Sequence, residues 1–522
     1  MTNEESRDRR GNGGHRGPDA GRTFRSAALL SLFFLVALTL GGAELRLLDA
    51  VKAGNGDAVR ALLKQPKVAA EVNAQEADGT TALQWAARAD DRDIAKALLD
   101  AHADPNIANR YGVRPLSLAA GNASAAMTEL LLNAGADANA PLPEGQTLLM
   151  AAARTGNPDV VRLLLARGVN VNARENLLGE TALMWAAAEN HPEAVALLVQ
   201  HGAEIDGRTS KLAFPKDRFG LEGVLTILPH GSWTALMYAG RQGSLGAARA
   251  LVEAGANVNL VDPDGSTAMV LAIINGHYDV AAMLTEKGAN PNIADSTGMA
   301  ALYAAVDMNT LGEVYGRPGR KSTSAVSALE LMKVLIAHGA DPNAQLRSAT
   351  LQRAHTPGEG LLGDGSTPLM RAAKNGDAAA ITLLLDRGAD PALTQRNHTT
   401  ALMFAAGLGR GQGVFAKDYA TERELLAAVK VLIEHGVDVN AFNDTGQTAM
   451  HCAAQASDDI VRYLAAHGAA LEPRDRQGRT PVDLALGVGL RGRAGGPPPV
   501  REKTAELIKQ LIAERNGKAS GN

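Results

Sequence analysis

Histidine is the side chain that proteins use most often for acid–base catalysis and metal binding, so four regularly placed histidines are the first candidates for chemistry. Each directly precedes a glycine after an apolar segment, and they are His201, His338, His435 and His467. This position suits the last turn of a helix, where a cation interacts favourably with the helix dipole and the free carbonyl groups. We therefore expect these histidines to cap helices rather than to bind a metal.

Other sequences with chemical potential are incomplete. Asp262-Pro263-Asp264-Gly265 has the beginning of a calcium loop but lacks its alternating ligands and its distal Glu. The glycine-rich run 409–413 has no strand before it that would form a phosphate-binding turn. The chain contains no H-E-x-x-H, C-x-x-C, G-x-S-x-G or Walker-type sequence. The sequence therefore predicts no catalytic residue, no metal site and no cofactor.

Two weaker possibilities for chemistry remain. The single cysteine, Cys452, lies in an alanine-rich apolar segment, which favours a buried structural thiol over a reactive one. One cysteine also excludes an internal disulfide. An enzyme site in the irregular segment 300–366 is an alternative, but the titratable residues there are too sparse to support it. They are His355, Glu359 and Asp364.

Aromatic residues recur directly after a repeated four-residue segment that begins with Thr, although aromatics make up only 3% of the chain. They are Trp85, Trp185, Tyr238 and Phe404. Aromatic side chains are typical anchors of protein interfaces, which gives a binding interpretation. Other copies carry leucine there, at Leu118, Leu271 and Leu484. We favour the alternative that this position is half-buried and serves packing, because leucine substitutes naturally in such a place.

Turn residues between the copies form a second group of candidates for partner contact. They are Arg110, Tyr111, Arg174, Glu175, Asp262, Asp264, Arg396, Asn397, Asp444 and Arg476. Turn propensity alone explains the Asn, Asp and Gly residues of these segments. As a set, and together with the aromatic position, they are nevertheless our prediction for a recognition surface.

The element that must position these residues is the segment 147–173, TLLMAAARTGNPDVVRLLLARGVNVNA. Thr147 suits the N-cap of a first short helix of small apolar residues. Pro158 suits the first turn of a second helix, which is expected to end at Gly168, where a left-handed conformation costs glycine little. Two such short helices cannot bury their apolar faces alone, so the segment is stable only when it stacks on similar ones.

Copies of this segment recur along the chain, and the commonest spacing, as between Thr234 and Thr267, is 33 residues. The equivalents of Thr147 are Thr81, Arg114, Thr181, Thr234, Thr267, Ala300, Thr367, Thr400, Thr448 and Thr480. The glycine that ends the second helix recurs in step, at Gly135, Gly168, Gly202, Gly255, Gly288, Gly339, Gly388, Gly436 and Gly468, with His102 in its place in the earliest copy. Three longer spacings indicate insertions.

These residues resemble the ankyrin repeat. The segments 181–184 (TALM) and 367–370 (TPLM) are similar to the T-P-L-H tetrapeptide of that family, and 339–344 (GADPNA) is similar to the G-A-D-x-N-A that closes its unit. The period is also that of the family. The resemblance covers the chain from about Glu44 to the C-terminal region. It implies an all-α ankyrin-repeat solenoid of about twelve helix-turn-helix repeats with finger-loop insertions, which binds a protein partner.

The chain departs from the family at the fourth residue of the tetrapeptide. Met commonly replaces the family's His, at Met150, Met184, Met237, Met370 and Met403. Of the copies, the one that contains His451 keeps the His. The hydrogen bonding that this His provides in the family is therefore in question for the other copies.

Composition agrees with a solenoid. The 522 residues include 55 glycines, which suits one glycine per repeat, and a solenoid forms one elongated body without a central core. The formal net charge of −4 gives no basic footprint, which argues against nucleic acid as the main partner. We expect a monomer whose partner is another protein.

The N-terminal region changes character abruptly. Residues 1–26 are polar and rich in Arg and Gly, whereas 27–40 (AALLSLFFLVALTL) are uncharged and largely apolar. This length suits the apolar region of a signal peptide and is short of the about 20 residues that a spanning helix needs. Small residues at 41–43 suit signal peptidase, so we expect cleavage and export to the periplasm of a bacterial cell.

Two other interpretations of this region stay open. An uncleaved signal anchor would hold the chain at the inner membrane through residues 27–43. A buried first helix of the solenoid is disfavoured, because 30–40 is apolar nearly all round.

The predicted order of segments follows the copies and their insertions. It is a leader at 1–43, an N-terminal cap repeat at 44–80, regular repeats at 81–206, a finger insertion at 207–233, regular repeats at 234–299, an irregular repeat with two insertions at 300–366, repeats with an insertion near 407–422 at 367–479, a C-terminal cap repeat at 480–516 and a tail at 517–522. Within the finger insertion, 221–228 is expected to form a hairpin arm or a strand. Function is expected on the concave surface made by first helices and finger tips.

Overall fold

The computed structural model describes residues 46–212, 230–309, 324–349, 361–409, 420–490 and 500–520. The predicted leader, the hairpin arm at 221–228, His355 and Glu359 lie outside these ranges.

The described residues form twelve consecutive helix pairs. The first helices are α2 (Leu47–Lys52), α5 (Ala82–Arg88), α7 (Pro115–Gly121), α9 (Leu148–Thr155), α11 (Ala182–Ala188), α13 (Ala235–Gln242), α15 (Ala268–Ile274), α17 (Ala301–Asn309), α19 (Pro368–Lys374), α21 (Ala401–Ala405), α23 (Ala449–Ala456) and α25 (Pro481–Ala485). The second helices are α3 (Gly56–Leu63), α6 (Arg92–Asp100), α8 (Ala125–Asn133), α10 (Pro158–Leu165), α12 (Pro192–Gln200), α14 (Leu245–Glu253), α16 (Tyr278–Glu286), α18 (Ala328–Ala337), α20 (Ala378–Asp386), α22 (Glu422–Glu434), α24 (Asp458–Ala466) and α26 (Glu502–Ser520). The all-α solenoid of about twelve helix-turn-helix repeats is confirmed.

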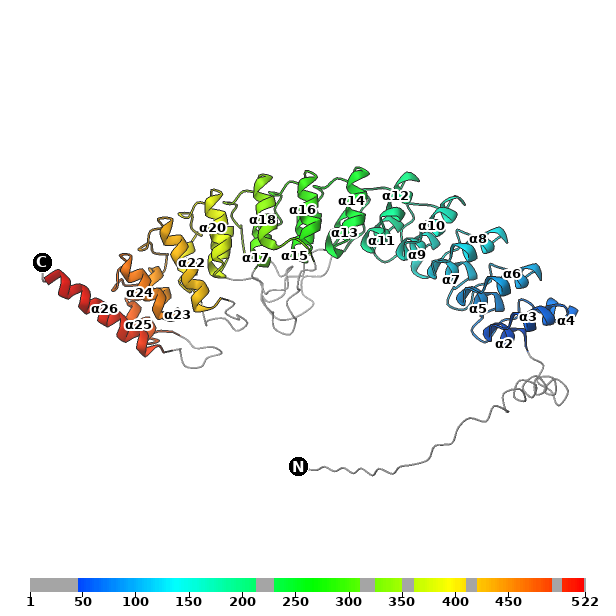
Figure 1. The fold of residues 1–522 in the computed structure, drawn as a ribbon, viewed down its shortest axis with the longest axis horizontal. Helices are drawn as coiled ribbons and strands as arrows, with labels where there is room; N and C mark the ends of the chain where they lie inside the picture. Colours follow the sequence, from blue (N-terminus) through cyan, green and yellow to red (C-terminus); the bar gives the residue numbers. More distant parts are fainter. Residues whose placement is uncertain are drawn as a thin grey trace, which may run out of the picture.

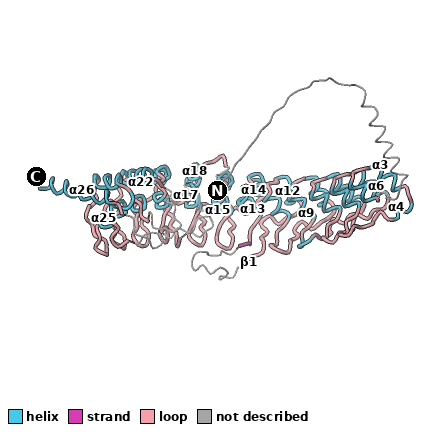
Figure 2. The backbone as a smooth tube through the Cα atoms, turned by 90° about the horizontal axis from the view of Figure 1, so that it is seen from below, coloured by secondary structure: helices cyan, strands magenta, loops and turns pink. Residues whose placement is uncertain are grey.

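The pairs stack side by side into an arch (Figure 1). From α5 to α25, each first helix contacts the first helices of its neighbours, and the second helices contact one another in the same way. First helices such as α9, α11 and α13 line the inner side of the arch, and second helices such as α10, α12 and α14 line the outer side. The finger loops project together along one edge, as Figure 2 shows.

The predicted helix ends are confirmed by the backbone geometry. The Thr147 side chain accepts a hydrogen bond of 3.2 Å from the backbone N–H of Met150, so it caps α9. Gly168 has a φ of 71°, and His102 takes the same left-handed conformation with a φ of 66°. His is one of the few types besides glycine that tolerate it. The register of the repeat therefore survives without glycine in the earliest copy.

The four repeated histidines behave as the sequence predicts. In each, ring Nδ1 donates to the carbonyl oxygen four residues earlier, at distances of 2.7 to 2.9 Å. They are His201, His338, His435 and His467. Each ring therefore adds a second hydrogen bond to a carbonyl group in the last turn of its helix, which also accepts from the backbone N–H of the same histidine.

Asparagine side chains join consecutive repeats on the outer edge of the fingers, a role that the sequence analysis did not assign. Asn106 is an example: its Oδ1 accepts from the Asp137 N–H (2.8 Å) and its Nδ2 donates to the Gly135 carbonyl (3.0 Å). The same pair of bonds to the next repeat is made by Asn172, Asn292, Asn343 and Asn440. The Asn of the closing G-A-D-x-N-A sequence is thus a bridge between repeats.

The base of the finger insertion is a short antiparallel pairing of β1 (Lys211–Leu212) with β2 (His230–Gly231). Lys211 pairs with Gly231 in its register. The Thr209 N–H also donates to the Trp233 carbonyl at 3.0 Å, so the chain leaves and re-enters the finger at one place. The neighbouring first helices α11 and α13 therefore pack as directly as in regular repeats.

Both ends of the solenoid differ in detail from the prediction. The N-terminal cap repeat contains a further helix, α4 (Pro66–Ala70), besides its two main helices. Away from the ends, a 3-10 helix, η1 (Pro143–Gly145), lies in a later finger. The second helix of the C-terminal cap repeat, predicted to end at 516, is α26, and it continues to Ser520. The tail expected at 517–522 is therefore helical as far as Ser520. A single helical glycine costs only about 1 kcal/mol, so Gly517 does not end the helix.

The substitution Leu164→Ala tests whether the core lies between stacked repeats. Its side chain is 0% exposed, and its helix α10 packs between α8 and α12. We expect Leu164→Ala to cost about 2–5 kcal/mol, because it leaves a cavity at an interface between repeats. Unfolding should also lose its two-state form, because only the neighbours of one repeat are weakened. Urea unfolding followed by circular dichroism measures both, with the half-buried Leu163→Ala as control. An unchanged midpoint for Leu164→Ala contradicts this placement.

Chemical labelling of Cys452 tests whether its side chain is buried in α23. The residue is 5% exposed, and burial raises the pKa of its thiol to about 12. At about pH 8 the native thiol is therefore protonated, and alkylation requires the helix to open. We expect slow iodoacetamide labelling of native protein and fast labelling in denaturant, measured by intact mass. The variant Cys452→Ala/Ala166→Cys, with an exposed thiol, should label fast in both. Equal native rates for the two proteins contradict the expectation.

Candidate functional site

The aromatic position lies on the inner row of helices, but its members differ in exposure. Trp85, Trp185 and Tyr238 are half-buried on α5, α11 and α13. Phe404 on α21 is 1% exposed and packs in the core. Phe404 is therefore a packing residue, and its prediction as a partner contact is corrected. The other three keep part of their surface open.

Trp233 belongs to the same cluster, although the sequence analysis did not select it. It directly precedes the N-cap Thr234, and its ring packs edge-on against Tyr238, with the ring centroids 5.4 Å apart. It lies outside the repeated aromatic position, which is why the recurrence missed it. Its signal in the sequence is that it is one of only three tryptophans and ends the insertion.

One carboxylate joins two of these aromatic residues across a repeat boundary. The Glu180 side chain accepts from Trp185 Nε1 at 2.8 Å and from the Tyr238 hydroxyl at 2.6 Å. Burial raises the pKa of Tyr238 far above its usual value, and the bond to Glu180 raises it further. Tyr238 is therefore a neutral hydrogen-bond donor at physiological pH, and its role is to fix this surface.

Each tryptophan ring has a cation over its face. The Arg154 guanidinium lies 5.4 Å from the Trp185 ring centroid, and Arg241 lies 5.3 Å from that of Trp233. Trp85 has Arg88 at 5.5 Å and the Lys52 ammonium at 4.8 Å. Such cation–π contacts contribute about 0.5–1 kcal/mol each at exposed sites.

Backbone hydrogen bonds link several finger tips to the preceding finger. The N–H of Arg110 donates to the Asp78 carbonyl (2.9 Å), that of Asp444 to the Asn397 carbonyl (2.9 Å), and that of Arg476 to the Thr445 carbonyl (2.8 Å). The predicted tip residues with exposed side chains are Arg110, Tyr111, Arg174, Arg396, Asn397, Asp444 and Arg476. Tyr111, at 68% exposure, is among the most exposed large apolar residues of the described chain.

Three predicted contact residues are buried in their turns instead. The Glu175 carboxylate accepts from the N–H groups of Leu177, Leu178 and Glu180 at 2.6 to 2.9 Å. Burial opposes its ionisation, but these hydrogen bonds outweigh burial and hold the pKa below its usual value. Asp262 Oδ1 accepts from the N–H groups of Asp264 and Ser266. Glu175, Asp262 and Asp264, the last two 6% and 5% exposed, are therefore turn-forming residues, which corrects their prediction as contacts.

Hydrogen bonds and an ion pair tie some exposed tips to neighbouring fingers. Arg396 pairs with Asp364 at 2.9 Å, and His398 Nδ1 lies 2.8 Å from Asp444. Arg174 donates to the Gly179 carbonyl at 3.2 Å and also reaches the carbonyl of Arg208 in the next finger. Exposed pairs of this kind contribute about 0–1 kcal/mol, so these side chains can exchange partners at little cost.

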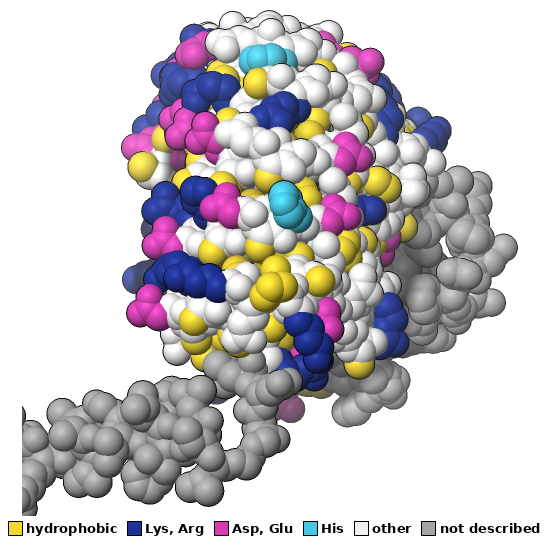
Figure 3. Space-filling view, turned by 90° about the vertical axis from the view of Figure 1, so that its right-hand side faces the viewer, with side chains coloured by type: hydrophobic (Ala, Val, Ile, Leu, Met, Phe, Trp, Pro, Cys, Tyr) yellow, Lys and Arg dark blue, Asp and Glu magenta, His cyan; other side chains and the backbone are white. Residues whose placement is uncertain are grey.

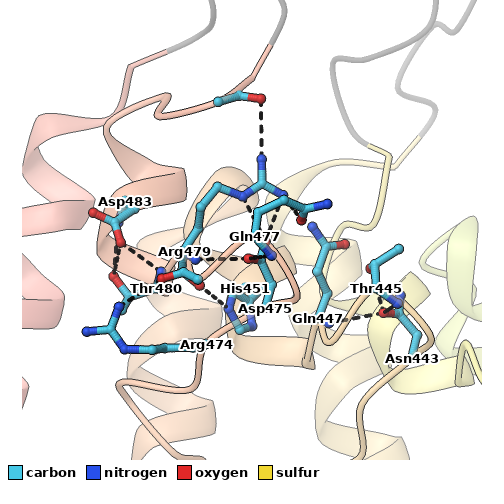
Figure 4. A network of polar contacts seen from close by, with 12 residues as sticks. Asn443, Thr445, Gln447, His451, Arg474, Asp475, Gln477, Arg479, Thr480 and Asp483 are labelled. Carbon is cyan, nitrogen blue, oxygen red and sulfur yellow. Dashed lines mark hydrogen bonds and ion pairs between the residues drawn. The ribbon is translucent and has the colours of Figure 1, made fainter.

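His451 makes the hydrogen bonds that were in question for the other copies (Figure 4). Its Nδ1 accepts from the Thr448 N–H at 3.1 Å, and its Nε2 donates to the Arg479 carbonyl at 3.2 Å in the next repeat. Gln84 performs both tasks in an early repeat, accepting from Thr81 N–H and donating to the Val113 carbonyl, each at 2.6 Å. The amide thus replaces the imidazole there, whereas methionine has no comparable donor.

Figure 4 also shows why the His451 network is rigid. The Asp475 carboxylate accepts from the backbone N–H groups of Gln477 and Arg479 at 2.9 Å and pairs with the Arg479 guanidinium at 2.7 Å. Burial opposes ionisation of Asp475, but these partners hold its pKa below the usual value. Burial lowers the pKa of His451, so the ring stays neutral and keeps one donor and one acceptor.

The irregular repeat contains a buried ion pair between Asp307 on α17 and Arg371 on α19. The side chains are 9% and 5% exposed. Burial, and secondarily Asp307, raise the pKa of the nearby Tyr278 to about 12. Asp364, the member of the alternative enzyme site that is described, pairs with Arg396 on the next finger. These groups link neighbouring repeats.

Within the described ranges, no group of three or more His, Cys, Asp and Glu side chains is placed to hold a metal ion. No helix within the same ranges has the length and apolar character that crossing a membrane requires.

Charges of both signs are mixed on the end of the arch that carries α3 and α4. Figure 3 shows Lys and Arg side chains alternating with Asp and Glu along one side of that end. This pattern differs from the single-sign stripe that nucleic-acid-binding proteins carry.

Comparison with known proteins gives the family. The family "Ankyrin repeats (3 copies)" matches residues 47–141, 116–209, 221–295, 323–414 and 418–490, which together cover most of the chain. A Caenorhabditis elegans homolog of transient receptor potential cation channel subfamily A member 1 is 30% identical over 23% of this chain and 9% of its own length. Ankyrin repeat and SOCS box protein 16 of Mus musculus is 34% identical over 23% of this chain and 25% of its own.

The chain thus spans a quarter or less of the length of these two relatives. Among solved structures, the human ASB11 ankyrin repeat domain aligns with 47% of this chain and 98% of its own, at 26% identity and a TM-score of 0.38. The repeated helix pairs, the capped turns and the extent of the family match lead to one conclusion: this chain belongs to the ankyrin-repeat family.

Proposed function

We propose that this chain is a non-enzymatic protein-interaction module, which binds a protein partner through the inner face of its arch and its finger tips. The observation that carries the proposal is the set of half-buried aromatic residues on the inner row, Trp85, Trp185 and Tyr238, together with Trp233, which packs against Tyr238. Aromatic side chains with part of their surface open are typical anchors of interfaces. Ankyrin repeats suggest an interaction module in general, and these residues support the inner face as its contact surface.

The rigidity of this surface supports the same function. The finger tips are joined by backbone hydrogen bonds, and Glu180 holds Trp185 and Tyr238 in fixed positions. A surface that is already ordered loses little conformational freedom when it binds, so more of the contact energy appears as affinity.

Two alternatives come from other classes. A membrane-anchored scaffold would hold a partner at the bilayer through residues 27–43, and an enzyme would use the irregular repeat at 300–366. The ion pairs of Asp307 and Asp364 give these groups a structural role, which favours the binding module over the enzyme. We propose a monomer in the periplasm after cleavage of the signal peptide.

Site-specific photo-crosslinking tests the binding surface. A photoreactive residue at Tyr111 or Asp444, both exposed finger-tip positions, should crosslink one defined partner in native cells. The same residue at Lys96, Arg162 or Arg249, exposed on the outer helices, should give no such product. Crosslinked species are identified by mass spectrometry. Products from the outer positions only, or none from either set, contradict the proposal.

Intact mass and N-terminal sequencing of protein from fractionated native cells test the leader. A mature chain that begins at or near Glu44 in the soluble exported fraction is the expected result, because the small residues at 41–43 suit signal peptidase. A full-length chain in the membrane fraction replaces this expectation by the anchored scaffold.

A further inference from the structure

All three tryptophans of the chain occur in the same three-part arrangement. In each, the indole Nε1 donates to a finger carboxylate: Trp85 to Glu76 at 2.6 Å, Trp185 to Glu180 at 2.8 Å and Trp233 to Asp262 at 3.4 Å. In each, an arginine lies over the ring at 5.3 to 5.5 Å. We call these the three Arg–Trp–carboxylate units, namely Arg88–Trp85–Glu76, Arg154–Trp185–Glu180 and Arg241–Trp233–Asp262.

The arginines of the units occupy one position of the repeat. Arg88, Arg154 and Arg241 each follow the N-cap threonine by seven residues, in the last turn of α5, α9 and α13. Their side chains are exposed on the inner row of helices. They therefore recur in every second repeat along the inner side of the arch.

The charges within a unit are not equally satisfied. Glu180 accepts from Trp185 and Tyr238, Glu76 accepts from Trp85 and pairs with Lys52, and Asp262 accepts from two backbone N–H groups and Trp233. None of the three guanidinium groups, by contrast, donates a hydrogen bond or pairs with a carboxylate within the described chain. The acids are occupied by donors, whereas the arginine donors are available.

The position over the indole ring prepares each arginine for one kind of ligand. A guanidinium is planar, and its N–H groups match the two oxygens of a carboxylate. The ring restricts the side chain, and the finger carboxylate restricts the ring, so less freedom is lost when a ligand binds.

The spacing defines the form of the ligand. Neighbouring helix axes lie about 8–10 Å apart, so arginines in alternate helices are about 16–20 Å apart. An extended chain advances about 3.3 Å per residue and covers that distance in about five or six residues. At the equivalent position, the intervening helices α7 and α11 carry the small residues Gly121 and Ala188, and a Cβ on Gly121 would meet no atom within 4 Å. No long side chain therefore stands between the units at this position of the repeat.

We infer that the inner face binds an extended acidic segment of a partner protein, with Asp or Glu side chains about five or six residues apart held by Arg88, Arg154 and Arg241. This inference rests on the proposed binding function and names the chemistry of the partner.

Synthetic peptides test it directly. The probe is a labelled peptide of about 14 residues with Glu at every sixth position in a Ser/Ala background, long enough to reach from α5 to α13. The matched peptide carries Gln in place of Glu. Because all three tryptophans lie in the units, intrinsic fluorescence reports on the site itself. We expect the Glu peptide to bind and to change tryptophan emission, with affinity that falls as salt is raised, and the Gln peptide to do neither.

Variants separate recognition from folding. The triple variant R88Q/R154Q/R241Q should weaken the Glu peptide by about fivefold or more, as expected for the loss of exposed ion pairs. R88K/R154K/R241K keeps the charge but not the planar fork and should lie between it and the wild type. The control R60Q/R162Q/R249Q makes the same charge change at exposed arginines of the outer helices α3, α10 and α14 and should bind like the wild type.

The outcomes distinguish this inference from the proposed function. No binding of the Glu peptide to the wild type, or equal binding by the inner triple variant and the outer control, overturns the acidic-segment inference. If photo-crosslinking at Tyr111 still captures a partner in that case, the binding function stands and its partner has another chemistry. If neither experiment gives a product, both fail.

Discussion

Each repeat depends on its neighbours, because two helices of five to thirteen residues, the range found from α5 to α24 outside the N-terminal cap, cannot bury their own apolar faces. The buried side chains of α10, such as Leu164, face adjacent pairs, and polar groups follow the same rule. Asn106 and its equivalents use both the oxygen and the nitrogen of their amide to bond to the next repeat. Several finger tips, such as that of Arg110, also donate a backbone N–H to the previous finger. The apolar and polar contacts thus repeat with one period and reinforce one another.

The features that sequence predicts well are those that every repeat needs. Thr147 and Gly168 set the ends of helices, and chain-local chemistry fixes their roles, so the same types recur and the period becomes visible. The capping histidines follow for the same reason, because the carbonyl that each one satisfies lies four residues away. Interactions of this kind join residues that are close in the sequence, so they can be predicted without knowing how neighbouring repeats pack.

The candidate site was predicted less well, because its contacts join different repeats. Glu180 binds Tyr238 across the insertion, a separation of 58 residues that no local pattern indicates. Trp233 stands outside the repeated position, and Phe404 has the right type in the right position but is buried. Glu175 and Asp262 are buried because their carboxylates accept hydrogen bonds from backbone N–H groups of their own turns. Residue type and spacing indicated where a surface lies, whereas exposure depended on how adjacent fingers pack.

The fingers and the inner helices are held in a fixed arrangement because the tryptophans connect them by hydrogen bonds. Trp85 and Trp185 belong to inner helices and Trp233 directly precedes one. The acid that receives each indole N–H belongs to a finger: Glu76, Glu180 or Asp262. A change in the angle of a finger would break these bonds, so tip residues and inner-row arginines keep a fixed relation. A ligand that contacts both therefore meets a surface whose parts are already aligned, and this alignment rather than contact area alone favours tight binding. The chain has few aromatic residues, and its three tryptophans all lie where a finger meets an inner helix.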